Sequence, residues 1–194
     1  MEHEILAPQD LARRFPMFET DGLRFALLAQ GGALLSDQII MGLLELLGAM
    51  GAIFTPNCRV LALDEALGRI TPTDGDKQAD QLIVAAGIGL PQIFPDMHAF
   101  APRRSLVVYA DPPPQWAEAW ANGPCWTGIG GDDDCWGIPP IGNIPMKLGF
   151  GRLSRQADPH RDRPTSQHET DTILAGYVGR FRDAHAFTPR MTLA

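Results

Sequence analysis

The sequence predicts an α+β or mixed α/β fold, with a largely antiparallel mixed sheet and flanking helices. Three observations lead to this fold class. Short apolar stretches bounded by glycine or proline recur between residues 58 and 152, which is typical of strands. One long segment, residues 36–51, has apolar residues at the three- and four-residue spacing of a helix. Strand and helix patterns follow each other in mixed order, without a repeat of 20–50 residues.

The clearest predicted helix is "SDQIIMGLLELLGAMG" (36–51). Its apolar stripe consists of Ile39, Ile40, Leu43, Leu44 and Leu47. Ser36 or Asp37 is expected to cap its beginning, because their side-chain oxygens can accept from free backbone N–H groups. Gly51 suits the left-handed conformation that closes a helix. Two further helices are predicted, over residues 7–15 and 167–185.

Strands account for most of the remaining pattern. They are predicted within residues 23–32, 58–66, 68–75, 80–89, 103–114, 125–140 and 144–152. Residues 58–75 should form a meander that turns at Gly68 and at Asp74–Gly75, and residues 125–140 a hairpin around Gly130–Asp134. The apolar "LIVAAG" predicts a strand covered on both faces.

Composition excludes several classes of protein. The 194 residues are 45% hydrophobic and 20% charged, which is typical of a globular chain. The net charge of −7 argues against a nucleic-acid surface, which would need a basic stripe. The longest apolar run, residues 39–54, is shorter than the roughly 20 residues that span a bilayer. With an acidic N-terminus unlike a signal peptide, we expect a cytoplasmic protein with no membrane contact.

Common catalytic and metal motifs are missing from the sequence. Cys58, Cys125 and Cys135 have no CxxC spacing, so neither a disulfide framework nor a zinc site is predicted. "DDD" (132–134) is interpreted as a hairpin tip rather than a metal site. Three stretches begin GxG but lack the third glycine of a dinucleotide loop: "GIGLPQ", "GIGGDD" and "GFGRLS". No serine lies in a GxSxG elbow, so a hydrolase is not supported.

Lys147 is the unexpected residue of the strand pattern "IPMKLGFGR" (144–152). Alternation along a strand would place Met146 and Leu148 on one face, and Lys147 and Gly149 on the other. Two interpretations stay open at this point. Lys147 is either an ordinary solvent-facing lysine or a cation that lines a cavity and stabilises negative charge there.

The order of several motifs along the chain carries a family resemblance. "HEILAPQDLARRFPMF", "GGALLSDQIIMGLLELLGAMGAIFTPNCRVLALD", "ADQLIVAAG", "PRRSLVVYADPP", "CWGIPP" and "MKLGFGR" follow one another. This order resembles the middle of FAD-dependent amine oxidases of the D-amino-acid-oxidase-like superfamily. It is most similar to the branch of monomeric sarcosine oxidase and N-methyltryptophan oxidase, and the resemblance covers nearly the whole chain.

The resemblance implies an FAD-dependent oxidoreductase with two lobes interleaved in sequence. Residues 1–51 and 90–194 would form the substrate-binding lobe, and residues 52–89 a strand-only part of the FAD-binding lobe. In such enzymes a hydride passes from an amine or amino acid to the flavin, and dioxygen reoxidises the flavin to give hydrogen peroxide. The small-molecule amine or amino acid and dioxygen are therefore the implied partners.

Specific residues carry over from the family. The resemblance implies that Lys147 lies near the flavin ring and activates dioxygen, and that Trp136 lies on the substrate side. Val60 matches a strand position whose backbone meets the adenine of FAD. The cofactor's ADP part would be flanked by Ala85, Ala86 and Gly87 of "VAAG".

The sequence also departs from the family pattern. Gly151 stands where related sarcosine oxidases have a histidine, and Gly89 where an aromatic residue is common. A GxGxxG unit and the segment that closes the flavin site are absent from these 194 residues. The sequence is thus expected to be the central portion of an oxidase. The alternative is a non-catalytic truncated product, or one part of a split oxidase that needs a complementary FAD-lobe chain.

Overall fold

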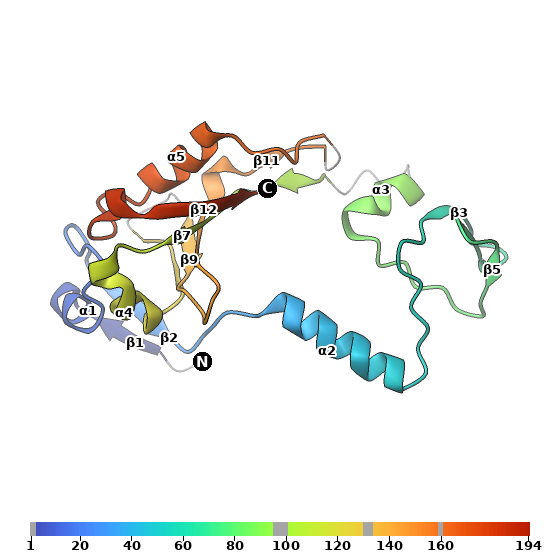
Figure 1. Cartoon of the computed structure of the whole chain (residues 1–194), viewed down its shortest axis with the longest axis horizontal. Coiled ribbons are helices and arrows are strands. Elements are labelled where there is room, and N and C mark those ends of the chain that lie inside the picture. The colour runs from blue at the N-terminus through green and yellow to red at the C-terminus, as the bar shows by residue number, and fades with distance from the viewer. Residues whose placement is uncertain (1–2, 95–100, 130–133, 159–160) are drawn as a thin grey trace. The chain divides into compact units, whose positions relative to one another are not determined.

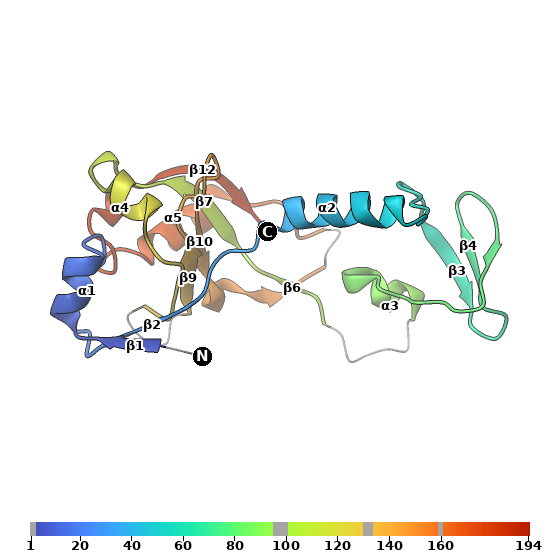
Figure 2. The ribbon, with the colours of Figure 1, turned by 90° about the horizontal axis from the view of Figure 1, so that it is seen from below.

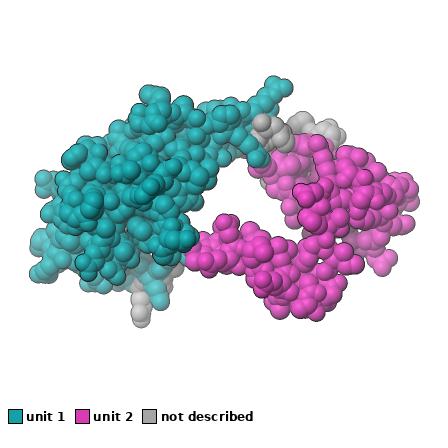
Figure 3. All heavy atoms as spheres, in the orientation of Figure 1, with its two compact units in different colours: residues 1–33, 103–194 teal, residues 34–102 magenta. Residues whose placement is uncertain are grey.

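The computed structural model describes residues 3–94, 101–129, 134–158 and 161–194. The chain forms two compact units, which are treated separately. Unit 1 comprises Met1–Ala33 and Arg103–Ala194, and unit 2 comprises Leu34–Pro102 (Figure 3). These units are defined by the contacts within each of them. The lobes expected from the sequence are defined instead by their roles in binding substrate and FAD. The division into functional lobes stays a prediction.

Unit 1 is built on a five-stranded antiparallel sheet with strand order β12-β7-β10-β9-β8 (Figure 1). The strands are β7 (Val107–Asp111), β8 (Trp126–Thr127), β9 (Cys135–Ile138), β10 (Met146–Phe150) and β12 (Thr188–Leu193). Pro112–Pro114 follow β7 directly and end it, because proline lacks the N–H that a ladder requires. The sheet is therefore assembled from strands distant in sequence, with the C-terminal strand next to β7.

One face of this sheet packs against the core of unit 1. Alternate residues of the central strands point into it, and Val108, Met146 and Leu148 are completely buried. Helix α5 (Gln167–Ala175) contacts β7 and β10 on this side. The core is rich in aromatic rings, such as Trp120 and Phe181, whose centroids lie 4.7 Å apart in an edge-to-face arrangement.

Smaller elements complete unit 1 (Figure 2). They are the hairpin β1 (His3–Leu6) with β2 (Ala26–Ala29), helices α1 (Pro8–Arg14) and α4 (Ala117–Ala121), the short pair β6 (Arg103–Arg104) with β11 (Arg155–Gln156), and 3₁₀ turns at Pro114–Trp116, Gly151–Leu153 and Ala184–Ala186. Helix α1 contacts β1, and its Leu11 is buried.

A buried ion pair fixes the beginning of α5. The Arg104 guanidinium, almost fully buried, donates to both carboxylate oxygens of Glu169 at 2.7 and 3.1 Å. It also donates to the carbonyls of Asp162 and Pro164. Glu169 forms a reciprocal capping box with Ser166. The hydrogen bonds from Arg104 lower the pKa of Glu169 from its ordinary value near 4.5 to about 2.

Unit 2 contains helix α2 (Ser36–Ala49) and a three-stranded antiparallel meander. The meander strands are β3 (Val60–Asp64), β4 (Arg69–Pro72) and β5 (Lys77–Gln78). Gly68 turns the chain between β3 and β4 with φ of +58°, in the left-handed region that favours glycine. A 3₁₀ turn at Gly87–Gly89 leads into the short helix α3 (Leu90–Ile93).

The predicted class of fold is confirmed, with mixed helices and antiparallel sheets throughout. The helix at 36–51, the meander turning at Gly68, and the strand at 144–152 are all present. The predicted hairpin at 125–140 is present as β8 and β9, and most of its tip lies outside the described residues. Gly51 has the expected positive φ, of +92°.

Three local predictions were wrong. No side chain caps α2, because Leu35 occupies the capping position and Ser36 already lies inside the helix. The predicted strand at 80–89 is absent, because residues 80–86 pair with no described residue and Gly87–Gly89 form a 3₁₀ turn. The last helix ends at Ala175 rather than at 185, and Gly179 beyond it adopts φ of +78°.

Strand β12 was not predicted. It had only a weak pattern in "AFTPRMTLA", with Pro189 inside it and a register shift between Pro189 and Met191. Within the described residues, no helix is both long and apolar enough to cross a membrane.

Candidate functional site

The outer face of the unit 1 sheet, opposite the core, carries a lysine among aromatic side chains. Lys147 in β10 is paired with Tyr109 of β7 on one side and with Ile138 of β9 on the other. Lys147 is partly exposed, whereas its neighbours Met146 and Leu148 are fully buried on the core side. The predicted alternation is therefore confirmed: Lys147 lies on the face that does not pack into the core.

Two rings hold the Lys147 ammonium group. Its Nζ lies 5.5 Å from the ring centroid of Trp136 and 5.9 Å from that of Tyr109. At these distances a ring face attracts a cation without neutralising its charge. No carboxylate among the described residues lies within ion-pair distance of Lys147. The arrangement is a positioned positive charge whose field stays available to a ligand on this face.

Glycine allows Trp136 to occupy its position. Gly149 is paired with Trp136 across β10 and β9, and a Cβ added at Gly149 would overlap the indole ring. The indole therefore lies directly over the backbone of β10. The structure brings together Lys147 and Trp136, two residues that the family resemblance assigned to the flavin and substrate sides.

The structure accounts for one departure from the family pattern. A Cβ at Gly151 would overlap the carboxylate of Asp134, whose carbonyl accepts a hydrogen bond from the Gly151 N–H at 3.0 Å. Any side chain at position 151, including histidine, would require Asp134 to move. In this chain the position of the Asp134 carboxylate is therefore compatible only with glycine at position 151.

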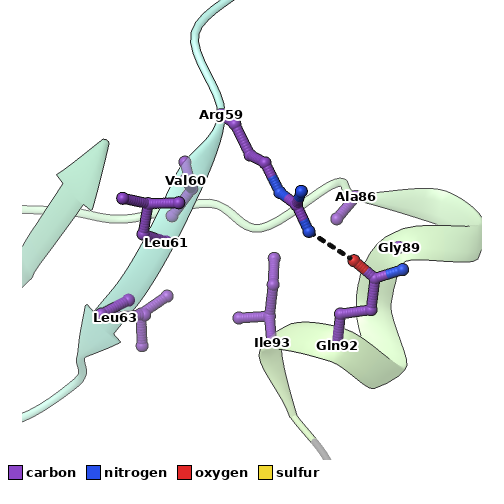
Figure 4. A pocket seen from close by; sticks show the side chains of 9 residues that line it. Arg59, Val60, Leu61, Leu63, Ala86, Gly89, Gln92 and Ile93 are labelled. Atoms are coloured by element: carbon purple, nitrogen blue, oxygen red, sulfur yellow. Dashed lines mark hydrogen bonds between the residues drawn. The ribbon is translucent and has the colours of Figure 1, made fainter. Parts of the chain in front are cut away.

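Unit 2 contains a separate pocket of about 350 Å³ (Figure 4). One side is formed by β3, and the other by the turn that leads into α3 and by α3 itself. Its lining is Arg59, Val60, Leu61, Ala62, Leu63, Ala86, Gly89, Gln92 and Ile93. The lining includes Val60 and Ala86, two of the predicted cofactor-binding residues. Ala85 and Gly87 flank Ala86 in sequence but do not line the pocket.

The polar side of this pocket consists of two side chains. Nη2 of Arg59 donates to Oε1 of Gln92 at 3.5 Å, the upper limit of a hydrogen bond (Figure 4). The rest of the lining is largely apolar, with Leu61 and Leu63 on β3 and Ile93 on α3. An apolar wall with a few polar groups is the usual composition of a small-molecule site, and the volume lies within the range of such sites.

The residues around both places contain no metal ligand set. No group of three or more His, Cys, Asp or Glu side chains that could hold a metal occurs among the described residues. His98, His160 and two residues of "DDD" lie outside them. The candidate functional groups are therefore Lys147 with its aromatic neighbours, and the residues that line the unit 2 pocket.

Comparison with protein families identifies the chain. The family model described as DAO, FAD dependent oxidoreductase, matches residues 1–188. The chain belongs to the DAO family. The cofactor of the DAO family is FAD, and the match covers both units of the chain.

Solved structures agree with the DAO fold. Glycine oxidase from Bacillus cereus has a TM-score of 0.77 at 10% identity, and covers 99% of this chain and 51% of its own. Glycine oxidase from Geobacillus kaustophilus has a TM-score of 0.73 at 15% identity, and the match covers 99% of this chain and 50% of the oxidase chain. L-proline dehydrogenase from P. horikoshii has a TM-score of 0.76 at 9% identity, and covers 98% and 51%.

At these identities the likeness shows the fold alone. The chain spans about half the length of the solved structures it matches. None of the curated proteins compared with the sequence matches it.

The chemistry of the unit 2 pocket lining suits the nucleotide part of the DAO cofactor, and the position of that part in the pocket stays a prediction. Val60 offers backbone at the edge of β3, and Ala86 and Gly89 are small enough to allow a close approach by a planar base. Arg59 supplies a guanidinium, the group best suited to a phosphate. Sequence reasoning missed Arg59 and Gln92, which lie 33 residues apart and meet only in the tertiary structure.

The sequence analysis also did not single out Tyr109, although the strand alternation around it predicts the face on which it lies. In "VVYAD" it is the middle residue of an alternating strand, which places it on the face away from Val108 and Ala110. Its distance to Lys147 depends on the pairing of β7 with β10, and no sequence pattern reports that pairing.

Proposed function

We propose that the protein oxidises a small amine or amino acid at the carbon next to its nitrogen, with dioxygen as the final electron acceptor. FAD supplies a two-electron acceptor when bound. The substrate loses a hydride and a proton to become an imine, which water hydrolyses. Dioxygen takes up the two electrons and two protons, and leaves as hydrogen peroxide.

The positioned cation Lys147 carries this proposal. One-electron transfer to dioxygen creates negative charge on oxygen, and a fixed ammonium lowers the cost of that charge in a poorly solvated place. The two rings at 5.5 and 5.9 Å keep the ammonium in position without pairing it with an anion. The chemistry needs such a group, and an ordinary surface lysine would not require two aromatic neighbours.

The proposed substrate class rests on the same face and on the similar structures. Trp136 and Tyr109 offer aromatic surface to an apolar substrate group, and we assign Trp136 to the substrate side. The similar structures are named as glycine oxidase, L-proline dehydrogenase and fructosyl peptide oxidase. These names favour an amino acid or a secondary amine. Because Asp134 fills the place next to Gly151, substrate contacts there should differ from the histidine pattern of sarcosine oxidases.

Cofactor contacts are proposed for the second unit. Val60, Ala85, Ala86 and Gly87 would contact the adenosine diphosphate part of FAD, with Val60 and Ala86 lining the pocket. Further polypeptide that supplies a GxGxxG unit, whether in the same chain or in a partner, would complete the cofactor site. We also propose a cytoplasmic location, where cysteines such as the three free ones of this chain stay reduced.

The test separates the two half-reactions in protein expressed from the complete reading frame that contains these residues, and loaded with FAD. Amines and amino acids are mixed anaerobically to follow flavin bleaching, and the reduced protein is then mixed with dioxygen. Lys147→Met should leave bleaching within a few-fold and slow reoxidation by roughly a hundred- to a thousand-fold, the usual cost of losing a well-placed electrostatic donor.

Lys77→Met is the matched control. Lys77 is the only other lysine of the chain, lies in unit 2 and pairs with Asp74 at 2.7 Å. Both half-reactions should be unchanged in this variant. A change of less than about threefold in Lys147→Met reoxidation would make Lys147 an ordinary surface lysine. Absence of bleaching with every amine would instead favour the alternative of a non-catalytic product.

A further inference from the structure

Beneath the outer face of the unit 1 sheet lies a buried hydroxyl that none of the proposed chemistry uses. Tyr177 follows α5 and is completely buried. Its hydroxyl lies 2.7 Å from the carbonyl oxygen of Gly149 and 2.8 Å from that of Trp136, so its single proton can be donated to either. These two residues face each other across β9 and β10.

The same pair of residues carries the aromatic part of the candidate site on the opposite face. There the Trp136 indole lies over Gly149, and the Lys147 ammonium is 5.5 Å from the indole centroid. One strand pair is therefore held by Tyr177 from the core side and covered by Trp136 from the outer side. A shift of this pair would move both Trp136 and Lys147.

The core fixes Tyr177 itself. Its ring stacks on Phe181 with centroids 4.9 Å apart, and Phe181 packs against Trp120 and Trp126. Burial raises the pKa of the Tyr177 hydroxyl, so the group stays a neutral donor at physiological pH. A rigid donor bonded to backbone carbonyls is suited to setting the position of a strand, because it acts on the chain and not on a mobile side chain.

We propose that Tyr177 is a positioning residue, which holds the Trp136–Gly149 strand pair so that Trp136 and Lys147 keep their mutual geometry. This inference rests on the proposed function only for its kinetic consequence. The geometric part concerns the chain alone and can be tested without cofactor or substrate.

The first experiment records the indole N–H signals of the four tryptophans by ¹H–¹⁵N NMR in the chain as it is. Trp136→Phe assigns the Trp136 signal. Tyr177→Phe keeps the ring and removes the hydroxyl, and should shift or broaden the Trp136 signal. Ile173→Val is the control, because Ile173 is a fully buried residue of α5 whose apolar side chain cannot donate a hydrogen bond to either carbonyl. An unchanged Trp136 signal in Tyr177→Phe would overturn the proposal.

The second experiment is a double-mutant cycle on reoxidation by dioxygen in the FAD-loaded protein. With Lys147 present, Tyr177→Phe should slow reoxidation by about tenfold, the scale of one lost hydrogen bond. In the Lys147→Met background the same change should slow it by less than about twofold, because the group being positioned is gone. Equal slowing in both backgrounds would assign Tyr177 a purely structural role. If the protein proves not to be an oxidase, the NMR result still decides the geometric inference.

Discussion

The two units of the chain differ in how far their apolar side chains are buried. Apart from Pro72, the buried apolar side chains among the described residues belong to unit 1, including Trp120, Tyr177 and Phe181. Most of the large hydrophobic side chains that are exposed belong to unit 2. In unit 1 several of the buried rings contact one another edge to face, whereas no residue of α2 is buried.

This difference shows that an apolar stripe in the sequence predicts a helix but does not predict which surface the stripe packs against. Helix α2 has the predicted stripe, yet Ile40 is 54% exposed and Leu44, one turn on, 37% exposed. Residues outside the stripe, such as Met41, are exposed as well. Large exposed apolar patches usually mark surfaces that contact something else. Unit 1 closes its own core, and unit 2 does not close one from its described residues.

The largest expected difference between the units is in the cost of truncating an apolar side chain. Trp120→Ala should lower the free energy of unfolding by about 3–5 kcal/mol, because it empties the centre of the aromatic cluster. Leu46→Ala in α2 should change it by no more than about 0.5 kcal/mol, because Leu46 is exposed and alanine favours a helix. Urea titrations followed by circular dichroism measure both.

The tryptophans sharpen this test. All four lie in unit 1, so their fluorescence reports that unit alone. Circular dichroism also includes α2 and the meander of unit 2. If the units differ as described, the fluorescence transition should come at a higher urea concentration than the dichroism change of unit 2. Coincident transitions by both probes would contradict two units of unequal stability.

An intermediate effect is expected from the buried ion pair of unit 1. The pKa of Glu169 is about 2 in the folded state, below its ordinary value, so the pair contributes stability above about pH 4.5 and loses it as pH falls towards 2. Glu169→Gln should therefore be less stable than the parent at pH 7, by about 2–3 kcal/mol, because it leaves the buried Arg104 without its charged partner.

Thermal unfolding from pH 7 to pH 2 measures that loss. The difference in melting temperature between the parent and Glu169→Gln should be constant above pH 5 and should disappear near pH 2. Lys77→Met is the comparison in unit 2, since Lys77 and Asp74 form an exposed pair that should change nothing measurable. A gap that persisted at pH 2 would show that Glu169 acts through packing or capping rather than through its charge.

Polar substitutions on α2 should have only a small effect on stability. Ile40→Gln with Leu47→Gln should alter the free energy of unfolding by only about 0.5 kcal/mol, because neither side chain is buried, with Ile40 54% and Leu47 40% exposed. The same variant should bind less of a hydrophobic dye and associate less at high concentration. Dye fluorescence and light scattering against the parent provide the measurement. A strong loss of stability would mean that the α2 face is buried in solution.

Local patterns predicted the elements that depend on neighbouring residues. The meander turning at Gly68, the helix at 36–51 and the alternation around Lys147 were predicted, because each depends on side-chain spacing or on a glycine conformation. Elements that depend on distant partners were not. The segment at 80–89 has the pattern of a strand but lacks a paired neighbour among the described residues, and β12 formed despite its proline because β7 was available.

The candidate site divides in the same way. The sequence by itself determined that Lys147 and Gly149 share one face, and its family resemblance predicts functional roles for Trp136 and Val60. Only the tertiary structure decided that Tyr109 flanks Lys147 and that Tyr177 holds the strand pair from below. The physical reason is that spacing along a strand fixes a side chain's face. Contacts across strands arise from pairing and core packing between segments far apart in the chain, which no local pattern encodes.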